Sequence, residues 1–131
     1  MVQTLFILNA LLTFPFGVLA LVAPGALFAQ FGLQLDAAAV LIARGYGATL
    51  VAYGVVLFFE RQSTDGRTVR AFLLSMVLFN AIEAVIQGIA GTQGVAAAII
   101  FANVAIHAVV AVLSFIALSR QSPISAPGVN L

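Results

Sequence analysis

The chain contains no cysteine, no tryptophan and no lysine among its 131 residues. Without cysteine it can form no disulfide, no thiolate metal site and no redox-active dithiol, which excludes the quinone-linked disulfide oxidoreductases. Without lysine, and with a net charge of +1, it lacks the basic cluster with which proteins bind a nucleic acid backbone. Nucleic acid is therefore not an expected partner.

Charged side chains of either sign are also scarce. They make up 7% of the residues, whereas soluble domains carry roughly 25%. Hydrophobic residues make up 63%. A soluble four-helix bundle needs polar outer faces, and a chain of this composition cannot supply them. The composition therefore indicates a membrane protein.

Four long apolar runs occupy most of the chain. A hydrocarbon core about 30 Å thick requires about 20 apolar residues at a rise of 1.5 Å per residue. The runs predict transmembrane helices at residues 5–22, 37–59, 71–90 and 95–118. The predicted fold is thus all-α, an integral membrane four-helix bundle over residues 1–118. Residues 119–131, rich in serine and proline, are expected to form a flexible tail.

The arginines outside the runs lie on one side of this bundle. They occupy the connection between the second and third runs and the segment after the fourth: Arg61, Arg67, Arg70 and Arg120. By the positive-inside rule this side is cytoplasmic, which predicts a multi-pass protein of the cell inner membrane with both termini in the cytoplasm. A cleaved signal peptide is the alternative for the first run, because residues 18–20 resemble a cleavage tripeptide. The absence of positive charge before that run favours a span.

Arg44 and Glu83 are the charged residues inside the runs. An ionised side chain at bilayer depth costs at least about 2.5–3.5 kcal/mol, so each needs a partner or a function. In antiparallel helices the two lie at nearly the same depth. We expect them to form an ion pair that sets the register of two helices. The alternatives are a ligand-binding or proton-carrying function, or an Arg44 that reaches the outer headgroups alone.

Other polar residues share faces with this pair. At 100° per residue, Asn80, Glu83 and Gln87 lie on one face of the third helix, and Asn103 and His107 lie on one face of the fourth. Lipid offers these groups no hydrogen bonds, so they are expected to converge on one interior cluster, in the outer half of the bundle. The predicted members of this cluster are Arg44, Asn80, Glu83, Gln87, Asn103 and His107.

Tyr46, Thr49 and Tyr53 form a stripe on the opposite face of the second helix from Arg44. We expect this stripe to contact the first helix, a partner protein or a second protomer. His107 is expected to be a hydrogen-bonding core residue rather than a haem or chlorophyll ligand, because the chain has no second histidine. No metal, cofactor or catalytic residue is predicted. An enzyme using Glu83 and His107 as acid and base is the least favoured class, since no nucleophile accompanies them.

Three short motifs carry a resemblance to known proteins. They are Pro24 after the first span, Phe31-Gly32-Leu33, and Arg44-x-x-Gly47 early in the second span. In these the chain resembles small uncharacterised bacterial four-helix membrane proteins, loosely like the DoxX group. The resemblance covers less than half the chain, and it implies a fold without a defined activity.

Two functions follow from these observations. The leading hypothesis is a non-enzymatic accessory or structural subunit, in which the cluster sets helix register. Its expected partners are the lipid bilayer and a membrane protein or a second copy of the chain. The alternative is a carrier or binding protein for a small amphiphile or a proton-coupled solute in an outward-facing polar cavity. In that case Arg44 would hold an acidic group and Glu83 would titrate.

Overall fold

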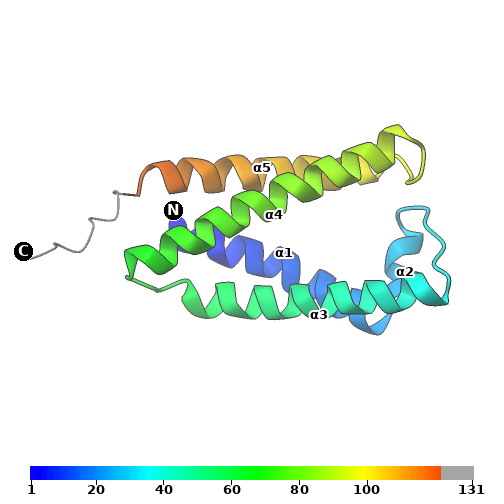
Figure 1. Cartoon of the computed structure of the whole chain (residues 1–131), viewed down its shortest axis with the longest axis horizontal. Helices are drawn as coiled ribbons and strands as arrows, with labels where there is room; N and C mark the ends of the chain where they lie inside the picture. Colours follow the sequence, from blue (N-terminus) through cyan, green and yellow to red (C-terminus); the bar gives the residue numbers. More distant parts are fainter. Residues whose placement is uncertain (122–131) are drawn as a thin grey trace, which may run out of the picture.

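The computed structural model describes residues 1–121 and contains five helices (Figure 1). They are α1 (Val2–Val22), α2 (Pro24–Ala29), α3 (Ala37–Glu60), α4 (Gly66–Thr92) and α5 (Ile100–Ser119). All but the short α2 are long and apolar enough to cross a membrane. Residues 1–121 contain no strand. The predicted all-α four-helix membrane bundle is thus confirmed, and the protein is a multi-pass membrane protein.

Local capping and turn residues decide where the helices end. Asp36 caps α3, accepting a hydrogen bond from the Ala39 N–H. α4 begins before the predicted residue 71 because Asp65 caps it. The hydroxyl and backbone amide of Thr68 donate to the Asp65 carboxylate and hold its pKa below the usual value.

The connections also differ from the expected pattern. Residues 24–29 lie between the first two predicted spans and form α2. This helix begins at Pro24, where a proline fits because the first amide of a helix needs no partner. α5 begins at Ile100 rather than at residue 95, after a turn in which Gly94 has a φ of +69°. α5 continues through Ser119, and the predicted flexible tail lies, from residue 122 onward, outside the described residues.

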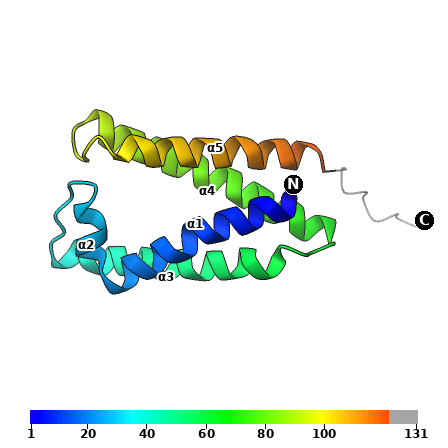
Figure 2. The same ribbon diagram turned by 180° about the vertical axis from the view of Figure 1, so that it is seen from behind.

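The spanning helices are arranged as two pairs. α1 packs along α3, and α4 packs along α5 (Figures 1 and 2). The first pair is closest where Gly17 faces Gly47. A methyl group added at Gly47 would lie 2.7 Å from the Gly17 carbonyl oxygen and 2.7 Å from the Leu21 nitrogen. Small residues at such positions let membrane helices approach to backbone contact.

The two pairs converge at one end and diverge at the other (Figure 2). We call the end with the α3–α4 connection the Arg-rich end, and the other the α2 end. Near the Arg-rich end an apolar core fills the space between the pairs: Leu5, Phe6, Ala10, Leu57, Val69, Leu73, Met76, Val110 and Ala117. At the α2 end the two connections meet, because the Ala97 N–H donates to the Phe31 carbonyl oxygen over 2.7 Å. The space between the pairs toward the α2 end contains most of the predicted polar residues.

Candidate functional site

Glu83 is the centre of a hydrogen-bonded cluster between α3 and α4. Its half-buried carboxylate accepts two hydrogen bonds from neutral groups. The Tyr46 hydroxyl, from α3, donates to Oε1 over 2.9 Å, and Gln87 Nε2, one turn along α4, donates to Oε2 over 2.8 Å. The two donors fix the orientation of the carboxylate without neutralising its charge.

The cluster continues to α5 through two further contacts. Asn103 Nδ2 donates to Gln87 Oε1 over 2.7 Å, and His107 Nδ1 lies 2.8 Å from Asn80 Oδ1. Asn80 is only 2% exposed, and its Nδ2 donates to the Met76 carbonyl oxygen. The structure therefore brings together five of the six residues that the sequence placed in one cluster, and adds Tyr46.

Arg44 lies outside this cluster, and the predicted ion pair with Glu83 does not form. The Arg44 side chain is exposed on α3 and has no hydrogen bond or ion pair within residues 1–121. The reason is the rotation of α3 about its axis. Gly47 and Gly54 face α1: an added methyl at Gly47 would lie 2.7 Å from backbone atoms of that helix, and one at Gly54 would lie 3.0 Å from side-chain atoms of Thr13 and Phe14. This rotation points Tyr46, about 200° from Arg44, toward α4.

Tyr53, from the same stripe, also points toward α4. The hydroxyl groups of Tyr53 and Ser75 lie 3.3 Å apart, a second polar contact between α3 and α4. Thr49 is exposed, and its hydroxyl donates to the Gly45 carbonyl oxygen. Tyr46 and Tyr53 therefore face α4, and Tyr53 also interacts with Asn9 of the first helix, as one of the expected contacts. Tyr46 is the site residue that the sequence interpretation missed. The glycines seven residues apart at 47 and 54 were the signal that could have revealed it, since they mark the face of closest helix packing.

Two cavities adjoin the cluster. One, of about 160 Å³, lies between α1 and α5, with Tyr46, Gln87, Asn103 and His107 on its polar wall. The other, of about 220 Å³, lies toward the α2 end and includes Glu83 in its lining. Phe16, Gln87 and Asn103 line both cavities. The polar cluster thus forms a wall of two adjoining spaces rather than a closed structural core.

The first cavity reaches the surface of the bundle between α1 and α5. Leu12 and Ile106 line it from these two helices, and they are 39% and 43% exposed. α1 and α5 diverge toward the α2 end (Figure 2). Because all four long helices span the bilayer, exposed leucine and isoleucine side chains at mid-helix face lipid. The cavity therefore has a lateral opening, toward the hydrocarbon core.

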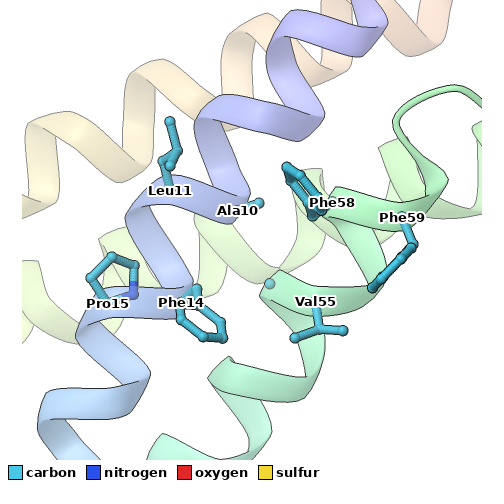
Figure 3. Close-up of a pocket in the computed structure, with 8 residues that line it drawn as sticks. Ala10, Leu11, Phe14, Pro15, Val55, Phe58 and Phe59 are labelled. Carbon is cyan, nitrogen blue, oxygen red and sulfur yellow. The ribbon is translucent and has the colours of Figure 1, made fainter.

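A third hollow, of about 250 Å³, lies on the outer side of α1 and α3 (Figure 3). Its lining is apolar throughout: Ala10, Leu11, Phe14, Pro15, Gly54, Val55, Phe58 and Phe59. Leu11 and Phe59 are 64% and 73% exposed, so the hollow faces lipid. It offers no polar group to orient a ligand, and a lipid acyl chain would fill it adequately. The candidate site is therefore the interior pair of cavities.

The comparisons with known proteins add no assignment to this geometry. Neither the protein-family models, nor the curated proteins, nor the solved structures contain a match to the chain. Within residues 1–121 no three residues among His, Asp and Glu are placed to hold a metal ion.

Proposed function

We propose that the protein binds a small lipophilic molecule in the two interior cavities. The observation that supports this proposal is that the polar cluster lines two cavities, and that its carboxylate, Glu83, forms no ion pair with Arg44. Apolar and aromatic walls with a few placed polar groups are typical of small-molecule sites. The lateral opening beside Leu12 and Ile106 suits a ligand that arrives through the bilayer.

The cluster also has hydrogen-bonding capacity left for a ligand. Asn103 Oδ1 and His107 Nε2 have no partner within residues 1–121, and both side chains line the first cavity. A carboxylate accepts up to about four hydrogen bonds, and Glu83 receives two. Polar groups at bilayer depth that lack partners are costly, and a bound molecule would satisfy them. The same residues in a purely structural role would be expected to satisfy one another.

Filling the cavity should abolish binding of a neutral probe. We expect phenylbutanol to bind saturably to the full-length protein in phosphatidylcholine nanodiscs, and Ile106→Trp to weaken this binding at least about tenfold, because the indole occupies the lateral opening. Binding is measured by equilibrium dialysis, with empty nanodiscs as background.

Val109→Trp is the matched control for this experiment. Val109 is 57% exposed on the same helix and does not line the cavity, so its replacement should leave the affinity unchanged. Equal binding by the wild type and Ile106→Trp, or no saturable binding to the wild type, would contradict the proposed function.

An accessory-subunit function is the second candidate, and Arg44 favours it. Arg44 lies eight residues beyond Asp36, about 12 Å into α3, and it is exposed. Its counter-ion must come from outside the described chain: a carboxylate of a membrane partner or a second copy, or a lipid phosphate reached by snorkelling. Native mass spectrometry of gently purified protein separates the functions, since it detects either a retained small molecule or a stoichiometric protein subunit.

We also propose that the Arg-rich end faces the cytoplasm of a cell whose inner membrane holds the protein. The chain has no cysteine, so single cysteines can be labelled cleanly with an impermeant thiol reagent in intact cells. Thr92→Cys should be labelled from outside, and Thr64→Cys only after the cells are opened. Both positions are exposed at opposite ends of α4. Labelling of Thr64→Cys in intact cells would reverse the proposed orientation.

A further inference from the structure

We infer that the molecule bound in these cavities is a lipophilic cation, of the class of an apolar amine with one positive charge. This inference rests on the proposed function and specifies the charge of the ligand. It follows from three features of the cavities: the sign of the charges around them, the state of the Glu83 carboxylate, and the aromatic rings beside it.

The fixed charge near the cavities is negative. Glu83 is the acidic residue in their lining, and no arginine lines either cavity. Arg44 is exposed on the far face of α3, and Arg61, Arg67 and Arg70 lie at the Arg-rich end. The acidic ligand expected from the sequence, held by Arg44, therefore has no cation to bind it. The other titratable groups that face Glu83 are Tyr46 on α3 and His107 on α5, while α1 and α2 present none.

The Glu83 carboxylate has no positive partner within residues 1–121. Its two hydrogen bonds come from a hydroxyl and a carboxamide. A charge at bilayer depth that is solvated only by neutral groups remains costly, and the cost is relieved by a counter-ion or by protonation. An ammonium group in the adjoining cavity would supply the counter-ion. Tyr46 and Gln87 already hold the carboxylate in a fixed position for it.

Aromatic rings surround the same cavity. Phe16 from α1, Phe28 from α2 and Phe31 from the following loop all line it together with Glu83. The ring centroid of Phe16 lies 6.4 Å from that of Phe28 and 6.5 Å from that of Phe31. Aromatic faces attract ammonium groups, most strongly where water is excluded. A carboxylate beside three phenyl rings is therefore a site with two independent preferences for an amine over an acid or an alcohol.

The shape of the site indicates the rest of the molecule. One carboxylate matches one positive charge, and cavities of about 160 and 220 Å³ accommodate a short apolar body. The lateral opening between Leu12 and Ile106 admits a molecule that partitions into lipid. These features favour an amine with an apolar tail or ring over a hydrated inorganic cation.

A charge series of probes tests this inference. Phenylbutylamine, phenylbutanol and phenylbutyrate have nearly the same shape and carry a positive, no and a negative charge at pH 7. Their binding to the full-length protein in phosphatidylcholine nanodiscs is measured by equilibrium dialysis against empty nanodiscs. We expect the amine to bind at least about tenfold more tightly than the alcohol, and the butyrate not to bind saturably.

Two variants and one control variant show which residues cause this preference. Glu83→Gln should remove the advantage of the amine over the alcohol, whereas Glu60→Gln, which removes the same charge at the far end of α3, should retain it. Phe28→Leu keeps the carboxylate but removes one aromatic face, and should reduce amine affinity several-fold more than alcohol affinity. If Glu83→Gln does not fold, the wild-type series and Phe28→Leu still decide the question.

The outcomes separate the two proposals. An amine that binds no better than the alcohol, or an advantage that survives Glu83→Gln, overturns the cation inference while alcohol binding leaves the proposed function standing. Tighter binding of the butyrate would also overturn the inference. Absence of saturable binding by all three probes would overturn both proposals.

Discussion

Replacing Gly47 with alanine is expected to lower the free energy of unfolding by about 3 kcal/mol. The added methyl group would lie 2.7 Å from the backbone of Gly17 and Leu21, a separation that real side chains essentially never show. Backbone atoms cannot move aside as the end of a flexible side chain can. α1 and α3 would therefore have to separate along their contact, and the packing that drives helix association in a membrane would be lost.

Gly45→Ala is the matched control for this substitution. Gly45 lies two residues away on the same helix, and an added methyl group there has no neighbour within 4 Å. We expect a change within about 1 kcal/mol, in the stabilising direction, because alanine is the better helix former. Unfolding in mixed micelles with rising dodecyl sulfate measures both variants. Equal effects of the two substitutions would show that Gly47 is not at the crossing of α1 and α3.

The spanning helices were predictable because the bilayer makes a strong demand on sequence. Each span needs about 20 apolar residues, and few other structures use such runs. The ends of the helices were less predictable, because they depend on single residues. Asp65 caps α4 six residues before its apolar run begins, and Gly94 turns the chain immediately before the fourth run, so that α5 begins five residues into that run. Neither effect alters hydropathy over a window long enough to define a span.

The rotation of α3 was not predictable from charge alone. An ion pair of Arg44 with Glu83 is the expected arrangement when only charge is considered, because two unpaired charges in lipid are costly. The cost for an arginine is smaller than that argument assumes, because its long side chain can reach the headgroups. Gly47 has no such freedom, since a larger residue there would not allow the backbone contact with α1, and Gly54 lies against Thr13 and Phe14 of the same helix. Helix packing therefore sets the rotation of α3, and Arg44 lies on the exposed face that this rotation gives it.

This rotation also determines what the site can bind. With Arg44 in the cavity, its guanidinium would either pair with Glu83 or bind an acidic ligand. With Tyr46 in that place, Glu83 has no positive partner within residues 1–121 and receives hydrogen bonds only from neutral groups. The rest of the cluster was predictable because Asn80, Glu83 and Gln87 share a helix face whatever the rotation of α3. The sign of the charge on the proposed ligand thus depends on the contact of Gly47 with α1, on another face of α3 from Tyr46.

A double-mutant cycle tests the rotation directly. We expect Tyr46→Phe and Glu83→Leu to be coupled by about 1 to 2 kcal/mol, because each removes one partner of the 2.9 Å hydrogen bond. This coupling energy is larger than the average of about 0.6 kcal/mol for hydrogen bonds between membrane helices, because the acceptor is a carboxylate. The free energies of unfolding are measured for the wild type, both single variants and the double variant in mixed micelles.

The cycle of Arg44→Leu with Glu83→Leu is the control. These two side chains lie on α3 and α4 without contact, so their effects should add to within about 0.5 kcal/mol. Arg44→Leu alone should change stability little in micelles, since the exposed guanidinium loses no partner within the described chain. Strong coupling of Arg44 with Glu83, and none with Tyr46, would require α3 to be rotated by about 200° about its axis. That rotation would also break the Gly17–Gly47 contact. In that case Gly47→Ala would destabilise the protein no more than Gly45→Ala.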